Sequence, residues 1–313
     1  MIRVLAKSRN TGWGRALNWA WVWLLPAFIL GVVALKLIND PDKLNQLLQV
    51  RFSNWAGLAF CLFLLPFNVV LEAWKWQSIL KPIEYKPLQD CVKVILSGKS
   101  LNVISPLGIG DAFARYFGIA TARRNQIYAA LLMDRFSQLL PTLVFGAGSV
   151  FYLLAHGFVV PVNSILLTVS VAGVLFSCLG LWGWWYRADL REYAQLIMRL
   201  DTRQILKIMT LAVARYAVFS IQFLLIFWSL GADLSFTVLC LGVAWIFLIK
   251  TLVPNISVLG DLVKRQLSAV LFFSFFTLDV GLVIVASFLV WLVNIVLPAL
   301  VGIPFVSQLK RSF

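Results

Sequence analysis

The chain has 313 residues, of which 61% are hydrophobic and only 13% are charged. A soluble globule of this length needs more polar side chains than this to cover its surface. The composition therefore predicts one all-α, polytopic membrane domain without a soluble catalytic module. The formal net charge is +14, and the basic residues cluster in short loops beside apolar runs. This is the positive-inside pattern of membrane proteins, and we therefore expect no nucleic-acid partner.

Residues that build metal and redox sites are sparse. The four cysteines are scattered through apolar segments, and His156 is the single histidine of the sequence. The sequence has no glycine-rich lysine loop of the nucleotide-binding type. We expect no metal, no cofactor and no catalytic residues, and any transport should be downhill or coupled to an ion gradient.

Apolar runs long enough to cross a bilayer, which takes about 20 residues, recur about six times. They cover approximately residues 17–37, 52–71, 127–154, 162–186, 208–230 and 280–306. The densest basic clusters lie before the first run, at 187–207 and after the last run. Since such clusters stay in the cytoplasm, both termini and the 187–207 loop are predicted to be cytoplasmic.

Two intervals between these runs are too broken to span. Charged residues, Pro106 and glycines interrupt 91–122, and the interval 234–278 divides into two short apolar runs. Each interval predicts a re-entrant hairpin of broken helices. Each half then has the order span, hairpin, span, and the halves run in opposite directions, which is an inverted-topology repeat. The first repeat covers about 52–155, a linking span and loop about 156–207, and the second repeat about 208–308.

The two hairpins carry versions of one motif. Each has a lysine, a hydroxyl residue and a leucine, then a proline, then a Gly-Asp pair with an arginine four residues after the aspartate. The residues are Lys99, Pro106, Asp111 and Arg115 in the first copy and Lys250, Pro254, Asp261 and Arg265 in the second. A charge at the centre of a bilayer costs about 3 kcal/mol on insertion scales, so repeated intramembrane ions indicate a functional site.

The motif predicts a site for a phosphate-bearing ligand. Half-helices should begin near Gly110 and Gly260 and present free amides and a positive dipole end. Each aspartate should pair with its arginine one turn away, whereas Lys99 and Lys250 have no acid at that spacing. We expect the four cations to bind the phosphate and the two aspartates to orient the arginines or contact an amine. The alternative is that these ions only pair with one another and lock the hairpins into the bundle.

Further polar residues are weaker candidates. They are Glu72, Asn102, Asp134, Arg135 and Arg215. Glu72, near the end of a span, is more typical of an interfacial anchor. Asp134 and Arg135 fit a structural pair as well as a substrate contact, and both interpretations of Arg215 stay open.

These residues resemble the motifs of a known family. The resemblance is carried by Glu72-Ala73-Trp74-Lys75-Trp76, the run 102–106, Gly110-Asp111 with Arg115, and Asp134-Arg135. They are similar to the lysylphosphatidylglycerol synthase transmembrane-region family, flippase-like proteins related to the membrane half of the bacterial multiple peptide resistance factor. The chain departs from the family pattern at Asp111 and Asp134, where glutamates are usual, and at Gly108, where an arginine is usual.

The resemblance implies a bacterial cytoplasmic-membrane protein that translocates a lipid with a polar head group. The lipid would be an anionic or aminoacylated phospholipid or a polyprenyl-linked lipid. The alternatives are a membrane-embedded enzyme that acts on a lipid phosphate and a non-transporting partner of a lipid-synthesis enzyme. The sequence also leaves a homodimer open.

The charge distribution makes a topology prediction. In a variant without its native cysteines, a cysteine placed at Arg199 should be protected from a membrane-impermeant thiol reagent in intact cells, because the 187–207 loop is predicted to be cytoplasmic. Rapid labelling of this cysteine from outside would contradict the predicted orientation.

Overall fold

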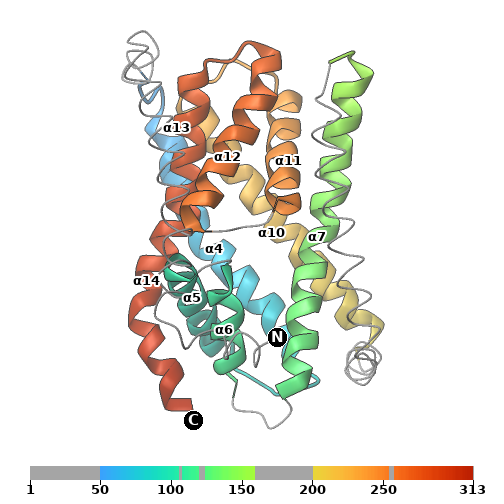
Figure 1. Cartoon of the computed structure of the whole chain (residues 1–313), viewed down its shortest axis with the longest axis vertical. Coiled ribbons are helices and arrows are strands. Elements are labelled where there is room, and N and C mark those ends of the chain that lie inside the picture. Colours follow the sequence, from blue (N-terminus) through green and yellow to red (C-terminus); the bar gives the residue numbers. More distant parts are fainter. Residues whose placement is uncertain (1–49, 106–107, 120–123, 159–199, 254–256, 313) are drawn as a thin grey trace, which may run out of the picture.

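The computed structural model describes residues 50–105, 108–119, 124–158, 200–253 and 257–312, and the secondary structure in these ranges is entirely helical (Figure 1). The predicted spans 17–37 and 162–186 lie outside the described residues. The predicted count of about six spans is therefore tested only for the remaining runs.

Four helical stretches in the described part of the chain are long and apolar enough to cross a membrane: Trp55–Leu80, Gln126–Ala155, Thr202–Ser229 and Val280–Leu309. The first three correspond to α4 (Trp55–Leu80), α7 (Arg124–Ala155) and α10 (Thr202–Ser229). The fourth is made of consecutive helical segments: α13 (Val280–Trp291), the π-helical η3 (Leu292–Val296), α14 (Leu297–Val306) and the 3-10 helix η4 (Ser307–Ser312). The protein is therefore a multi-pass membrane protein.

Two pairs of shorter helices accompany these spans. The first pair is α5 (Leu88–Ile104) with α6 (Gly110–Phe117), and the second is α11 (Phe236–Leu252) with α12 (Val258–Phe273). Even the longest of them, α5 and α11 with 17 residues each, reach about 25 Å at a rise of about 1.5 Å per residue, less than the roughly 30 Å of a hydrocarbon core. In Figure 1, α5 and α6 occupy the lower half and α11 and α12 the upper half.

Side-chain caps begin the second helix of the first pair. After α5 ends, Gly108 has a φ of 66°, in the left-handed region that glycine tolerates. The amide of Gly110 then donates to the Ser105 hydroxyl at 2.8 Å, and the amide of Asp111 donates to Oδ1 of Asn102 at 3.4 Å. Asn102, a candidate ligand contact, therefore caps α6.

Side chains also satisfy backbone groups at the break between the helices of the second pair. Ser257 is the N-cap of α12, and its hydroxyl accepts from the amide of Gly260 at 3.0 Å. This cap starts α12 at Val258, slightly before the expected start near Gly260. At the other side of the break, Lys264 donates to the Val253 carbonyl at 2.9 Å and satisfies an orphan acceptor at the end of α11.

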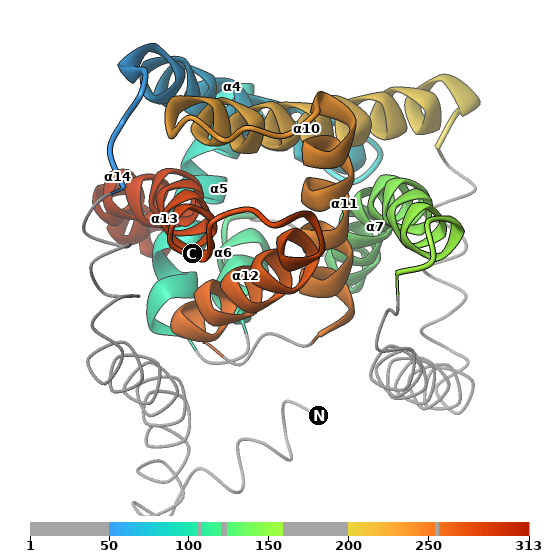
Figure 2. The ribbon, with the colours of Figure 1, turned by 90° about the horizontal axis from the view of Figure 1, so that it is seen from above.

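The helices pack around two apolar cores. One lies among α4, α10, α11, α12 and α13 and includes Phe223, Val243 and Phe272. The other lies among α4, α5, α7 and α10 and includes Trp76 and Ile95. Viewed from above, α4 and α10 lie side by side along one edge of the bundle (Figure 2), and they share the largest helix-helix contact.

A small third cluster connects the two helix pairs. Val103 near the end of α5 packs against a cluster that contains Val258 and Leu262 of α12 and Trp291 of α13. The sequence predicts that the hairpin tips at Pro106 and Pro254 approach one another, and both prolines lie outside the described residues. Their described neighbours along the chain, Val103 and Val258, share one apolar cluster.

A close approach between α14 and α5 gives a test of this packing. A Cβ at Gly302 would collide with the carbonyl of Leu96, whereas a Cβ at Gly148 on α7 would meet nothing within 4 Å. Gly302→Ala should therefore destabilise the protein by about 1–3 kcal/mol through overpacking. Gly148→Ala should be neutral or slightly stabilising, because alanine favours the helix. Equilibrium unfolding in mixed micelles measures both, and equal effects would contradict the close α5–α14 contact.

Candidate functional site

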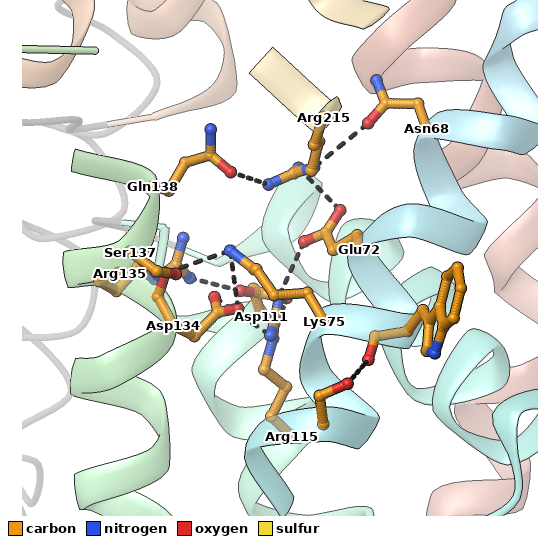
Figure 3. Close-up of polar contacts among 12 residues, drawn as sticks. Asn68, Glu72, Lys75, Asp111, Arg115, Asp134, Arg135, Ser137, Gln138 and Arg215 are labelled. Carbon is orange, nitrogen blue, oxygen red and sulfur yellow. Dashed lines mark hydrogen bonds and ion pairs between the residues drawn. The ribbon is translucent and has the colours of Figure 1, made fainter. Parts of the chain in front are cut away.

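A buried carboxylate on α4, that of Glu72, is the centre of the ion pairs in the first half of the chain (Figure 3). Only 5% of Glu72 is exposed. Three cations from three other helices reach it: Lys99 of α5 at 3.1 Å, Arg115 of α6 at 2.7 Å and Arg215 of α10 at 2.8 Å. The interpretation of Glu72 as an interfacial anchor is wrong, because its charge is paired inside the protein.

Arg115 is fully buried, and each of its guanidinium nitrogens lies near a carboxylate. Nε pairs with Asp111 at 3.0 Å, Nη2 with Glu72, and Nη1 lies 3.2 Å from Asp134. The predicted i to i+4 pair with Asp111 therefore forms. The guanidinium also lies 4.8 Å from the centre of the Trp76 ring. Its planar fork suits such multiple pairing, in which Nη1 has the Asp134 ion pair but no hydrogen-bond partner among the described residues.

Neighbouring residues on α7 contact different partners. Asp134, which is 3% exposed, pairs with Lys75 of α4 at 3.0 Å as well as with Arg115. Arg135, with 59% of its side chain exposed, pairs with the other oxygen of Asp111. Asp134 and Arg135 are thus not paired with each other, and both link α7 to ions on other helices.

Arg215 joins this group from α10. Its Nη2 contacts Glu72, its Nε donates to Asn68 at 3.2 Å, and its Nη1 donates to Gln138 at 3.2 Å (Figure 3). Sequence reasoning missed Asn68, Gln138 and Lys75 as members of the site. A signal was present, because Asn68, Glu72 and Lys75 are spaced i, i+4 and i+7 and therefore share one face of α4.

We call these eight ionised residues the first ion cluster. Its cations are Lys75, Lys99, Arg115, Arg135 and Arg215, and its acids are Glu72, Asp111 and Asp134. Every cation has at least one carboxylate partner. Lys99 has no acid one turn away on its own helix, as the sequence indicates, but Glu72 of α4 supplies a carboxylate partner.

The second ion cluster, formed by Lys250, Asp261 and Arg265, has a single acid. Arg265, 1% exposed, pairs through Nε with Asp261 at 2.7 Å, which is the predicted i to i+4 pair. Lys250 lies 3.9 Å from the same carboxylate, at the limit of an ion pair. Among the described residues, neither Nη1 nor Nη2 of Arg265 has a hydrogen-bond partner. Both outer nitrogens of Arg265 thus lack any acceptor in the described part of the chain, whereas each guanidinium nitrogen of Arg115 lies within 3.2 Å of a carboxylate.

A cavity of about 510 Å³ lies between the two clusters. Its charged lining residues are Lys99, Arg135, Arg215, Lys250 and Arg265. Its other lining residues are Leu132, Phe136, Gln138, Leu139, Thr142, Tyr216, Phe219, Phe247, Thr251, Leu252, Asn294 and Ile295. No acidic residue is among the described residues that line it. The cavity lining therefore combines positive charges with apolar side chains.

The structure brings some of the candidate residues into this cavity and leaves others behind it. Lys99 from the first motif and Lys250 and Arg265 from the second line the same cavity, together with Arg135 and Arg215. The remaining candidates, Glu72, Asn102, Asp111, Arg115, Asp134 and Asp261, are not among its lining residues. Four of these are the carboxylates that hold the cations. Within the described ranges, no group of three or more His, Cys, Asp or Glu side chains could hold a metal ion.

The first ion cluster predicts a large stability effect at its centre. Glu72→Gln should reduce the free energy of unfolding by about 3–5 kcal/mol, because it leaves buried cations without their shared carboxylate. The control is Asp90→Asn, which removes a carboxylate paired with Lys93 where both side chains are 43% exposed. This exposed pair should be worth no more than about 1 kcal/mol. Equilibrium unfolding in mixed micelles measures both variants, and equal losses would contradict the central role of Glu72.

Comparison with known proteins supports the resemblance seen in the motifs. Residues 15–302 match the family model described as lysylphosphatidylglycerol synthase TM region. No curated protein and no solved structure matches the chain. Because the family model covers nearly the whole sequence, including both ion clusters, the chain belongs to the lysylphosphatidylglycerol synthase transmembrane-region family.

Proposed function

We propose that the protein is a flippase-like transporter that moves a lipid with a phosphate-bearing head group across the bacterial cytoplasmic membrane. The family ties the chain to lipid handling in a membrane. The observation that carries the proposal is the cavity, whose wall contains cations from both motifs and no acid among its described lining residues. Guanidinium and ammonium groups are the usual protein donors to phosphate oxygens.

The shape of the lining suits a lipid better than a soluble anion. Phe219 and Phe247 are among several apolar side chains that line the cavity together with the cations. Leu132 and Phe136 also line the cavity, and each is 60% exposed on the surface of α7. In a bilayer this edge would adjoin hydrocarbon, so acyl chains can remain in lipid while the head group enters.

The arrangement of the helix pairs supports a transport mechanism. The pairs α5–α6 and α11–α12 lie in opposite halves of the molecule, and each carries one copy of the motif (Figure 1). We propose that they are the re-entrant elements of an inverted repeat in a protein with six spans. Transporters of this type place their substrate at the interface of the repeats and expose it to one side at a time.

Orientation belongs to the same proposal. The C-terminal end of α14, the beginning of α10 and the α4–α5 connection lie at one end of the molecule (Figure 1). Lys81 and Lys86 belong to the α4–α5 connection, and Arg203 belongs to the first turn of α10. By the positive-inside rule we propose that this end faces the cytoplasm.

A transport assay tests the proposal. Purified protein reconstituted in vesicles should move a phosphatidylglycerol with a fluorescent acyl chain from the inner to the outer leaflet. An impermeant quencher outside the vesicles then reduces its fluorescence. Lys250→Gln should slow this movement by about tenfold, because Lys250 lines the cavity and the loss of one charge-assisted hydrogen bond is worth about that factor. Its loose contact with Asp261 means that the fold should tolerate the change.

The control is Lys93→Gln, which removes the same charge from an exposed position on α5 outside the cavity lining. It should leave the rate unchanged. Mass spectrometry of the recovered lipid distinguishes the alternative of an enzyme, because transport returns the lipid unaltered. Equal rates in protein-free vesicles, or chemical conversion of the lipid, would overturn the proposal.

A further inference from the structure

Arg265 carries an unsatisfied, buried donor pair. Its Nε is occupied by Asp261 at 2.7 Å, and its Nη1 and Nη2 have no hydrogen-bond partner among the described residues. The residue is 1% exposed and lines the cavity. Buried guanidinium groups normally use their planar fork on a carboxylate or a phosphate. The free side of Arg265 therefore has the chemistry of an anion site.

Asn294 provides a second unsatisfied donor in the same cavity lining. It is 1% exposed, and its Nδ2 has no partner among the described residues. It belongs to the π-helical segment Leu292–Val296, just before Pro298. Pro298 has no backbone N–H and therefore cannot donate to a carbonyl of this segment. Single π-turns in a helix are frequent at functional sites.

The donor character of Asn294 is fixed by its neighbours. Nε of Arg215 can only donate, and it contacts Oδ1 of Asn68 at 3.2 Å. This contact turns the amide nitrogen of Asn68 toward Asn294, whose Oδ1 accepts at 3.2 Å. The nitrogen of Asn294 is then the atom left over. A chain of hydrogen bonds from Arg215 thus leaves an unpaired donor on Asn294, a residue of the cavity lining.

The lining also selects by charge. Lys99, Arg135, Arg215, Lys250 and Arg265 line the cavity, and no carboxylate is among its described lining residues. The acids that contact these cations, Glu72, Asp111 and Asp261, are all engaged in ion pairs. An ammonium group on a ligand would meet several like charges and no acceptor of opposite charge.

From these observations we propose that the cavity binds a lipid whose head group is anionic and carries no ammonium group, and that its phosphate contacts Arg265 and Asn294. This assignment rests on the transport proposal and narrows its substrate class. It separates simple anionic phospholipids and polyprenyl phosphates from aminoacylated lipids, whose head groups carry one or more ammonium groups.

Binding measurements on the purified full chain in micelles test the head-group class. The probes are dioctanoyl phosphatidylglycerol, its lysyl ester and inorganic phosphate. Phosphatidylglycerol should bind at least about tenfold more tightly than the ester, because the ester brings ammonium groups to a cationic lining. Inorganic phosphate should compete only weakly. Preference for the ester would overturn the anionic assignment, and equally strong competition by inorganic phosphate would overturn a lipid ligand.

Two variants test the residues. Asn294→Asp keeps the size and the acceptor for Asn68 but replaces the free donor by a charge, so it should weaken phosphatidylglycerol binding by about tenfold and improve binding of the ester. Arg265→Lys keeps the charge but loses the fork and should weaken phosphatidylglycerol by a similar factor. The matched control is Asn54→Asp, the same change at the exposed N-cap of α4, which should leave binding unaltered. Unchanged binding in both cavity variants would overturn the assignment.

The same lipids in the vesicle assay separate this proposal from the transport proposal. Selective binding without movement between leaflets would refute transport and leave the head-group site intact. Equal transport of both lipids, unaffected by Asn294→Asp, would refute the head-group site and leave transport intact.

Discussion

The buried contact between Glu72 and Arg115 is the interaction on which the first half of the structure depends. The Glu72 and Arg115 side chains are 7% and 0% exposed, and their charged atoms lie 2.7 Å apart. Removing a charge from water is costly, and the cost is recovered only when the partner has good geometry and further hydrogen bonds satisfy both groups. Here Asp111 and Asp134 complete the pairing of Arg115, while Lys99 and Arg215 complete that of Glu72. Helices α4, α5, α6, α7 and α10 are thereby held around one ionic centre.

The same rule explains the difference between the two motif copies. In the first copy each arginine nitrogen meets a carboxylate, so the interpretation that the ions lock the hairpin into the bundle describes Arg115 well. In the second copy Asp261 is the only acid of its cluster, and the outer nitrogens of Arg265 remain without partners in the described part of the chain. Repetition of a sequence motif therefore does not imply repetition of its role. The number of carboxylates around each arginine distinguishes them.

Much of the fold could be predicted from sequence because spans and breaks are local properties. Apolar length identified α7 and α10, and the i to i+4 spacing identified both Asp-Arg pairs. Glu72 was misinterpreted because a charge near the end of an apolar run is the same pattern whether it faces head groups or buried cations. The helix α4 continues past this charge to Leu80, and its Glu72 and Lys75 are paired with residues of other helices. Asn68 and Asn294 are far apart in the sequence, so their contact could not be predicted without the packing of α4 against η3.

The cavity shows how the two clusters act together. A cation inside a membrane protein has to be hydrated, paired or bound to an anion, because hydrocarbon provides neither hydrogen-bond acceptors nor opposite charge. The carboxylates of the first cluster lie behind the cavity lining and draw Lys99, Arg135 and Arg215 toward one side of it. These cations keep their carboxylate partners, so a ligand would gain only their outer donors. The buried Nη1 and Nη2 of Arg265 have no carboxylate partner among the described residues. An acceptor on the ligand could therefore bind them without breaking an existing hydrogen bond. Since the unpaired donors belong to Arg265, we expect the phosphate to bind on the α12 side of the cavity. The cations of the first cluster, held by their carboxylates, contribute positive charge to the same lining.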